Sequence, residues 1–306
     1  MKLGSRGSPL AVAQSRLVAR MLGLGEDAIQ TFMTSGDKIQ GRLQDQGGKG
    51  LFTKELDEAL LDGRIDIAVH SMKDLPTRMP EGLLLACVPA REDARDGFIA
   101  TRARTLMELP AGATVGTASL RRQAQTLHAR PDLKVELLRG RVETRLAKIE
   151  SGAFDATYLA LAGLKRLGLE KHAASIVDAE AMPPAPGQGA LAITCRSDDA
   201  QTIARLAQIN IAEHAVTTTA ERAFLEALDG SCRTPIAATA HIDGGTLHFL
   251  GEVLTPDGQH RWRRQDSVAL GTDHIASARA LGLKLGAEIK AEAGPLYTSH
   301  FGDKGW

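Results

Sequence analysis

The sequence predicts an α/β protein in which two domains with mostly parallel sheets are followed by a small α+β domain. Two runs of alternating strand-like and helix-like segments indicate the parallel sheets, because parallel strands need a long crossover that is usually a helix. A charged stretch at residues 91–96 separates the two runs. In the C-terminal third, turn sequences between apolar runs indicate hairpins and therefore an antiparallel sheet.

Length and composition agree with several domains. The chain has 306 residues, 43% of them hydrophobic, which allows a sizeable core and two or three domains. We expect a first α/β domain over residues 1–92, completed by about 190–208. A second α/β domain should span residues 93–189, and the C-terminal α+β domain residues 209–306.

The first run begins with a helix at Ser8. Serine is a favoured N-cap residue, and Pro9 follows at the first helical position, where proline is favoured. Apolar residues then recur at helical spacing and predict one face of this helix: Leu10, Ala13, Leu17 and Met21. A strand is predicted next, at residues 29–34.

A second helix follows the glycine-rich residues 47–50. Leu56, Ala59 and Leu60 share one face of it, and Gly63 is placed to end it. The apolar residues 65–69 come next and are typical of a buried strand.

The same alternation recurs in the second run. Strands are predicted at residues 114–117, 135–138 and 156–161, and helices at 120–127, 142–149 and 163–167. Ligands of open α/β sheets bind beyond the carboxyl ends of the strands. We therefore expect the two domains to face each other across a ligand-binding cleft.

The last third of the chain has a different pattern. We predict a helix at residues 218–228, strands at 236–242 and 247–254, a further strand after the turn at 256–258, and a final helix at about 273–291. The turn Asp243-Gly244-Gly245 joins the first two strands into a hairpin.

Charge and cysteine content exclude several classes of protein. Basic and acidic residues balance at 37 each, with a pI of about 7.1, so no overall field favours nucleic acid or an anionic membrane. The three cysteines include no C-x-x-C pair, which argues against a disulfide framework and a zinc site. With neither an apolar signal core nor a membrane-length apolar run, we expect a cytoplasmic protein without metal.

Asp74 is the first candidate for chemistry. It follows the predicted strand at residues 65–69 and is preceded by Lys73, so it should lie where a parallel sheet opens toward its ligand. Spacing alone leaves two roles open, a catalytic carboxylate and an aspartate that only caps a turn.

Arginines follow two successive strands of the second run. Arg121 and Arg122 come directly after residues 117–119 at the start of a helix, where free N–H groups already favour an anion. Arg139, Arg141 and Arg145 occupy the next junction. Solvated arginines at helix ends are the alternative, above all for Arg141. Because no P-loop or G-x-G-x-x-G motif is present, this many arginines favours a ligand with several carboxylates over a nucleotide.

The cysteines differ in their surroundings. Cys87 and Cys195 lie in apolar runs and should be buried. Cys232 lies in a segment with Gly230 before it and Arg233 after it, which is the setting of a reactive thiolate. A cysteine protease would also need a partnered histidine, which the sequence does not locate.

Motifs in nearly every part of the chain resemble one family. They are residues 5–11 (SRGSPLA), 47–55 (GGKGLFTKE), 70–74 (HSMKD), 116–122 (GTASLRR), 138–140 (LRG), 162–168 (AGLKRLG), 186–190 (PGQGA) and 230–235 (GSCRTP). In this order they resemble the porphobilinogen deaminase (hydroxymethylbilane synthase) family. Two positions depart from its commonest pattern, since Ser231 stands where glycine is frequent and Arg141 where asparagine is frequent.

The resemblance implies a fold and an activity. It implies two doubly wound domains similar to type II periplasmic binding proteins around a cleft, and a C-terminal domain that carries the cofactor cysteine. The implied enzyme is a transferase of haem and chlorophyll biosynthesis. It joins four porphobilinogen molecules head to tail, releases ammonia each time, and uses a dipyrromethane primer bound to Cys232 by a thioether.

The resemblance also implies roles for individual residues. The catalytic pair would be Asp74 and Lys73. The cofactor would be bound by Cys232, Lys73, Asp74, Ser119, Arg121, Arg122, Arg139 and Arg145. The substrate would be bound by Arg6, Ser8, Lys49, Lys54, Arg166 and Gln188.

Partners follow from the same resemblance. The substrate is porphobilinogen, the product hydroxymethylbilane would pass to uroporphyrinogen III synthase, and the enzyme should be a monomer. The alternative is a cytoplasmic module, similar to solute-binding proteins, for a polycarboxylate ligand. The missing export signal and the Cys232 segment argue against that alternative.

Overall fold

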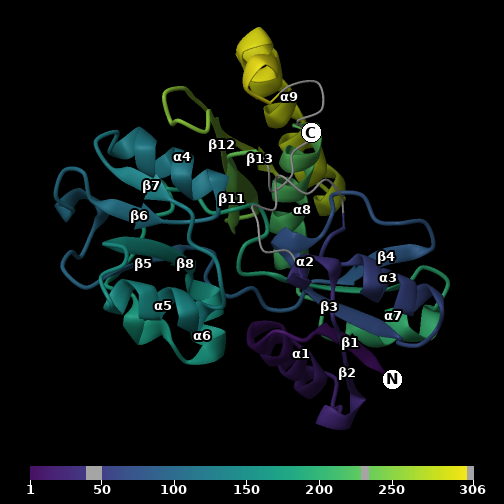
Figure 1. The fold of residues 1–306 in the computed structure, drawn as a ribbon. Helices are drawn as coiled ribbons and strands as arrows, with labels where there is room; N and C mark the ends of the chain where they lie inside the picture. Colours follow the sequence, from purple (N-terminus) through teal and green to yellow (C-terminus); the bar gives the residue numbers. More distant parts are fainter. Residues whose placement is uncertain (39–49, 229–233, 302–306) are drawn as a thin grey trace. The chain divides into compact units, whose positions relative to one another are not determined.

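The computed structural model describes residues 1–38, 50–228 and 234–301 (Figure 1). The chain forms two compact units. The first unit comprises residues 1–92 and 188–216, and the second comprises residues 93–187 and the chain from 217 onward. The division into three domains stays a prediction.

The first unit contains a five-stranded mixed sheet with the strand order β2-β1-β3-β10-β4. Its strands are β1 (Leu3–Arg6), β2 (Ile29–Phe32), β3 (Ile67–Ser71), β4 (Leu83–Cys87) and β10 (Leu191–Arg196). β1, which was not predicted as a strand, pairs in parallel with β2 and β3, but β10 is antiparallel to both of its neighbours. The chain enters β10 at the carboxyl end of β3, where Leu191 pairs with Ser71, and this entry point reverses the strand.

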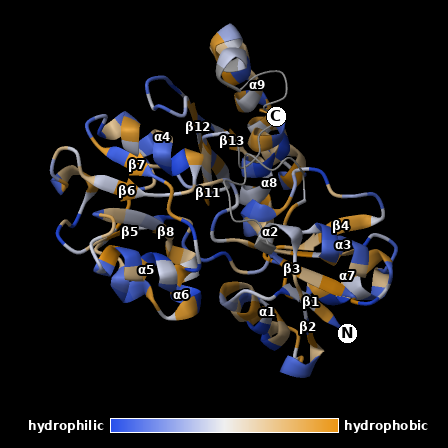
Figure 2. Cartoon of the chain, viewed as in Figure 1, coloured by the Kyte–Doolittle hydropathy of each residue, from blue (hydrophilic) through white to orange (hydrophobic). Residues whose placement is uncertain are grey.

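Helices cover both faces of this sheet (Figure 2). They are α1 (Pro9–Met21), α3 (Lys54–Leu61) and α7 (Ala200–Ala207). Val18 of α1 and Leu206 of α7 share one buried cluster with the strands, and Leu56 of α3 belongs to another. The predicted buried face of α3 and its end at Gly63, which has a positive φ of 70°, are confirmed.

The predicted face of α1 is wrong by about one residue. Ser8 caps the helix and Pro9 opens it as predicted. The buried residues, however, are Ala11, Gln14, Ser15, Val18 and Ala19. Met21 of the predicted stripe is 37% exposed. One residue turns a helix by 100°, so two apolar stripes compete here, and the sheet selects the one on which Gln14 reaches Ser71.

The second unit contains another five-stranded mixed sheet, with the order β7-β6-β8-β5-β9. Its strands are β5 (Asp96–Ala100), β6 (Thr114–Gly116), β7 (Lys134–Glu136), β8 (Ala156–Ala160) and β9 (Ser175–Ile176). β6 pairs in parallel with β7 and β8, whereas β5 is antiparallel to β8 and β9. Helices α5 (Val142–Glu150) and α6 (Leu161–Leu167) pack on one face, and α4 (Leu120–Ala129) lies against Tyr158 on the other.

A three-stranded antiparallel sheet completes the second unit, as predicted for the C-terminal third. It consists of β11 (Ile236–Asp243), β12 (Thr246–Leu254) and β13 (Arg261–Ala269). Gly244 and Gly245 both have a positive φ, which the two-residue hairpin turn between β11 and β12 requires. Phe249 of β12 packs against Phe224 of α8 at 5.3 Å between ring centroids.

Two long helices pack closely beside this sheet. They are α8 (Ala212–Ala227), which starts before its predicted position, and α9 (His274–Phe301), which extends past its predicted end. A Cβ on Gly282 of α9 would lie 2.2 Å from the carbonyl oxygen of Ala220, so the close approach requires glycine there. The backbone of α9 is broken at Gly294.

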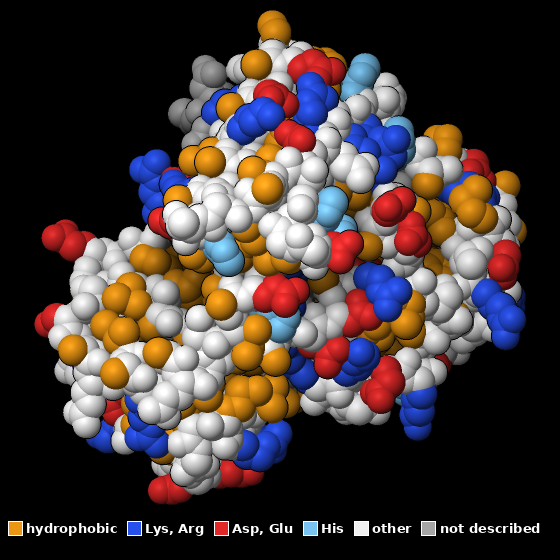
Figure 3. Space-filling view, turned by 180° about the vertical axis from the view of Figure 1, so that it is seen from behind, with side chains coloured by type: hydrophobic (Ala, Val, Ile, Leu, Met, Phe, Trp, Pro, Cys, Tyr) orange, Lys and Arg blue, Asp and Glu red, His pale blue; other side chains and the backbone are white. Residues whose placement is uncertain are grey.

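The remaining elements are short. They are α2 (Ser35–Lys38) and the 3-10 helices η1 (Glu26–Ala28), η3 (Met72–Asp74), η4 (Leu106–Glu108) and η5 (Glu170–His172). Within the described residues, no helix has the length and apolar character needed to cross a membrane. On the face drawn in Figure 3, basic and acidic side chains are interspersed.

Candidate functional site

Asp74 lies in η3, directly after the carboxyl end of β3. Arg6 is the last residue of β1, which runs parallel to β3, so both side chains lie at the same edge of the sheet. Arg6 Nη1 is 3.9 Å from Asp74 Oδ2, with 21% and 33% of the two side chains exposed. The ring of Phe52 lies 4.2 Å from the Arg6 guanidinium. The ion pair is therefore long, and the carboxylate is open to a ligand.

His70 lies beneath this edge and was not singled out from the sequence. It is 5% exposed, and its Nε2 is 3.2 Å from Thr194 Oγ1 on β10. Burial, and next the positive charge of Arg6, lower the pKa of His70 to about 4. The imidazole is therefore neutral near pH 7 and adds no charge to the edge.

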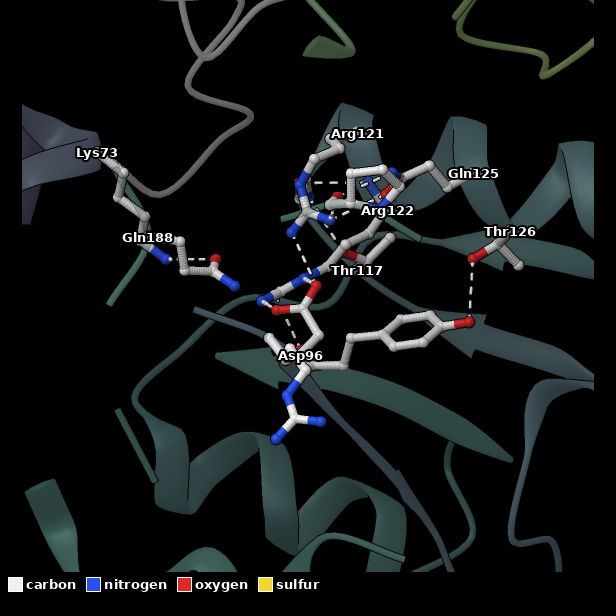
Figure 4. A network of polar contacts seen from close by, with 12 residues as sticks. Lys73, Asp96, Thr117, Arg121, Arg122, Gln125, Thr126 and Gln188 are labelled. Atoms are coloured by element: carbon white, nitrogen blue, oxygen red, sulfur yellow. Dashed lines mark hydrogen bonds and ion pairs between the residues drawn. The ribbon is translucent and has the colours of Figure 1, made fainter. Parts of the chain in front are cut away.

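Lys73 and Gln188 form a second polar contact of the first unit (Figure 4). Lys73 Nζ donates to Gln188 Oε1 at 3.3 Å. Gln188 is 1% exposed, and its carbonyl oxygen accepts from Arg91 Nε at 3.0 Å. The buried amide thus holds the exposed lysine beside Asp74.

Three other predicted substrate residues belong to the first unit. Ser8 caps α1, since its hydroxyl oxygen accepts from the N–H of Ala11 at 3.3 Å. Lys54 is 70% exposed and lies 3.9 Å from Glu58. Lys49 lies outside the described residues. The described contacts of Ser8 and Lys54 do not test their predicted roles.

In the second unit, β6 leads through a turn into α4, as predicted. Ser119 is the N-cap residue, and its hydroxyl accepts from the N–H of Arg122 at 3.4 Å. Thr117 in the same turn accepts from the N–H of Ser119 at 3.1 Å. This local geometry places Arg121 and Arg122 in the first turn of α4, with side chains 5% and 8% exposed.

Asp96 is a residue that the sequence interpretation missed. It begins β5, and its fully buried carboxylate accepts from both arginines of α4 (Figure 4). Arg121 Nη2 is 2.8 Å from Oδ2, and Arg122 Nη2 is 2.7 Å from Oδ1. Burial acts to raise the pKa of Asp96, but the charges of Arg122 and Arg121 outweigh it and hold the pKa well below its usual range.

Two further arginines lie near this pair. Arg139 Nη1 is buried and has no hydrogen-bond partner among the residues that the structure describes. Arg145 Nε donates to the carbonyl oxygen of Gly140 at 2.8 Å. Burial, followed by the charges of Arg122 and Arg139, lowers the pKa of Arg145 to about 10. Burial is the larger cause, and the contribution of the two neighbouring charges shows that Arg145 lies close to other cations.

The arginine cluster, which we define as Arg121, Arg122, Arg139 and Arg145, therefore holds more positive charge than Asp96 neutralises. The unpartnered Nη1 of Arg139 and the lowered pKa of Arg145 both fit a ligand carboxylate. Arg166 lies in the last turn of α6, and Arg141 is exposed at the start of α5. Their roles toward a ligand stay predictions, as do those of the cluster.

The prediction that Cys87 and Cys195 are buried is confirmed. They are 1% and 0% exposed within the sheet of the first unit. Burial raises their pKa values to about 12 and about 11, so both thiols are protonated and unreactive near pH 7. Cys232 lies outside the described residues.

Two family profiles match the chain. "Porphobilinogen deaminase, dipyromethane cofactor binding domain" matches residues 1–204, and "Porphobilinogen deaminase, C-terminal domain" matches residues 215–291. A porphobilinogen deaminase of Caulobacter vibrioides is 52% identical over 96% of both chains. One of Phenylobacterium zucineum is 49% identical over 96% of this chain and 97% of its own.

Solved structures of binding proteins are similar to part of the chain. A periplasmic substrate-binding protein of an ABC transporter from Coxiella burnetii covers 68% of this chain and 91% of its own, with 16% identity and a TM-score of 0.40. A nutrient binding protein from Burkholderia cenocepacia bound to methionine covers 68% and 90%, with 15% identity and a TM-score of 0.39.

Proposed function

The chain belongs to the porphobilinogen deaminase family, a family of transferases of tetrapyrrole biosynthesis with a dipyrromethane cofactor, and we propose which of its residues carry that activity. The enzyme joins four porphobilinogen molecules head to tail into hydroxymethylbilane. Asp74 is the catalytic carboxylate, and its openness at the edge of the sheet beside Arg6 is the observation that carries this proposal.

The chemistry needs a fixed negative charge. Loss of ammonia from the aminomethyl group of the substrate leaves a cationic azafulvene, and the attack of a pyrrole ring then places positive charge on a ring nitrogen. A preorganised carboxylate stabilises such charges. Asp74 is the group for this task, holding pyrrole N–H groups and assisting proton transfer. Lys73, held by Gln188, lies next to it.

The arginine cluster binds the carboxylates. Each porphobilinogen unit carries an acetate and a propionate, so the growing chain brings many negative charges. Arg139 and Arg145 have the least neutralised guanidinium groups of the cluster and are the first partners for these carboxylates. Arg6, Ser8, Lys49, Lys54, Arg166 and Gln188 bind the substrate, and Ser119 assists in holding the cofactor.

Cys232 is the attachment point of dipyrromethane, which supplies the pyrrole ring to which the first substrate is joined. The high pKa values of Cys87 and Cys195 support this choice, because a thioether forms from an accessible, reactive sulfur. The flanking Gly230 and Arg233 support it as well.

Intact-mass measurement of the freshly purified protein tests the proposal. We expect an added mass of dipyrromethane size, and peptide mapping should locate it on Cys232. A protein with no covalent adduct would instead be a polycarboxylate-binding module. An adduct on Cys87 or Cys195 would refute the assignment of the cysteine.

The proposal extends to the setting of the enzyme. It acts as a monomer in the cytoplasm, and its product is taken up by uroporphyrinogen III synthase, as the family resemblance implies. Sedimentation of the cofactor-loaded protein should give the mass of one chain, 32.6 kDa plus the adduct. A stable dimer would contradict the proposal that the enzyme is a monomer.

A further inference from the structure

Gln125 connects the arginine cluster to the C-terminal sheet. It lies one turn after Arg121 in α4 and is 5% exposed. Its Oε1 accepts from Arg121 Nη1 at 2.9 Å (Figure 4). Its Nε2 donates to Glu252 Oε1 on β12 at 2.8 Å and to the carbonyl oxygen of Pro183 at 2.9 Å.

Glu252 is the far end of this connection. Its side chain is 1% exposed, and its second oxygen accepts from Arg263 Nε on β13 at 3.0 Å. Arg263 is 29% exposed and also donates to the carbonyl oxygen of Glu180. A continuous series of hydrogen bonds therefore runs from β13 through Glu252 and Gln125 to Arg121.

The chemistry of Glu252 fixes the orientation of Gln125. An ionised carboxylate only accepts hydrogen bonds, so it draws the NH₂ group of the amide toward itself. The carbonyl oxygen of Gln125 must then face Arg121. With a neutral hydrocarbon in place of Glu252, only the carbonyl oxygen of Pro183 would still hold the NH₂ group, and the amide would be less firmly kept from turning its donors toward the guanidinium.

The result is a guanidinium that is held from two sides. Asp96 and Gln125 bind its two terminal nitrogens, and the carbonyl oxygen of Pro183 accepts a further bond from Nη1 at 3.0 Å. Arg121 Nε, in contrast, is buried and has no partner in the described part of the chain. The arrangement leaves the Nε–H of Arg121 for a ligand.

We infer that Glu252 and Gln125 are positioning residues, through which the C-terminal sheet orients Arg121 for a ligand carboxylate. The inference rests on the proposed role of Arg121 in binding the cofactor. Neither residue touches the ligand itself. The C-terminal part of the chain thus contributes to the cofactor site by a second route besides the Cys232 segment.

The test is the rate at which the chain acquires its cofactor. Full-length protein produced in cells that make no porphobilinogen is incubated with porphobilinogen, and the adduct is followed by intact mass. We expect Gln125→Met to slow loading about tenfold or more, because the Arg121 guanidinium loses the hydrogen bond that positions it. Glu252→Met should slow loading less, since the carbonyl oxygen of Pro183 still accepts from Gln125 Nε2.

Arg263→Met is the matched control. It removes the ion pair of Glu252 on the side away from Gln125, so loading per folded molecule should stay within twofold of wild type, while stability falls because the buried carboxylate loses its counter-charge. If Glu252 served stability alone, Arg263→Met and Glu252→Met would affect loading equally. If Gln125→Met fails to fold, the loading rates of Glu252→Met and Arg263→Met still test the inference.

A double-mutant cycle separates the inference from the proposed function. In an Arg121→Lys background, Gln125→Met should add almost nothing, because the two residues act as one unit. Additive effects, or wild-type loading of Gln125→Met beside slow loading of Arg121→Lys, would overturn the inference and leave the role of Arg121 intact. A wild-type chain that never gains the adduct would refute both.

Discussion

The two units each contain an arginine–aspartate pair at one edge of a sheet, and the pairs differ in almost every physical respect. Arg6 and Asp74 are 3.9 Å apart and partly exposed. Arg121 and Arg122 hold Asp96 at 2.7 to 2.8 Å with almost no exposure. The open aspartate is available for chemistry, whereas the buried one is part of the frame that keeps the arginines in place. Residue type alone does not separate these two roles.

Asp96→Asn should have the largest effect on stability. Loss of the carboxylate leaves two buried guanidinium groups without their counter-charge, which costs about 3–5 kcal/mol of folding free energy. Urea unfolding measures the change. Asp93→Asn is the control, because Asp93 pairs with Arg95, which is 45% exposed, and such pairs contribute about 0–1 kcal/mol. If both variants lost the same free energy of unfolding, the buried pair would be no more important for stability than the exposed one.

Asp74→Asn should raise the free-energy barrier of the reaction by about as much as Asp96→Asn lowers the free energy of unfolding. It should change stability little. Replacement of a preorganised carboxylate by an amide costs roughly 2.7–4 kcal/mol, or about a hundredfold to a thousandfold in turnover. Steady-state kinetics and a melting curve on one preparation report both quantities. A destabilised variant with normal turnover would make Asp74 a turn-capping residue.

His70 should make the first unit sensitive to acid. Its pKa is lowered to about 4 in the folded protein, so the fold favours the neutral imidazole. The stability that depends on the neutral form is therefore fully present above the ordinary pKa of 6.5. As the pH falls from 6.5 toward 4, roughly 3 kcal/mol of stability is lost. Unfolding free energies across this range should fall less steeply for His70→Gln. Identical pH profiles would show that His70 does not titrate in this way.

Arg139→Gln should have the smallest effect on the fold and a clear effect on binding. Its Nη1 has no partner in the described chain, so little is lost on removal. A missing bond to a ligand carboxylate should raise the KM for porphobilinogen about tenfold. Arg141→Gln is the exposed neighbour for comparison, and its KM should be near that of wild type. If Arg141→Gln gave the larger change, the two arginines would have to exchange roles.

Local signals in the sequence predicted most elements. The N-cap at Ser8, the turn at residues 117–119 and the two glycines of the hairpin depend only on neighbouring residues, and all are confirmed. The direction of β10 and the buried stripe of α1 depend on residues far away in the chain, so local spacing could not determine them.

The site shows the same division. The sequence located the arginines at their strand-to-helix junctions but missed Asp96, which lies 25 and 26 residues away from its partners. A charged residue at the start of an apolar strand, as in residues 96–99, is the signal that could have found it. The strand's alternation places Asp96 on the same face as Phe98, toward α4.

The most direct test compares Asp74→Asn and Asp96→Asn in single-turnover release of ammonia per folded, cofactor-loaded molecule. The predicted outcome is that Asp74→Asn releases ammonia at least a hundredfold more slowly at an unchanged melting temperature. Asp96→Asn should melt at a lower temperature, yet its folded and loaded molecules should react at nearly the wild-type rate. A near-normal rate for stable, loaded Asp74→Asn would contradict the account.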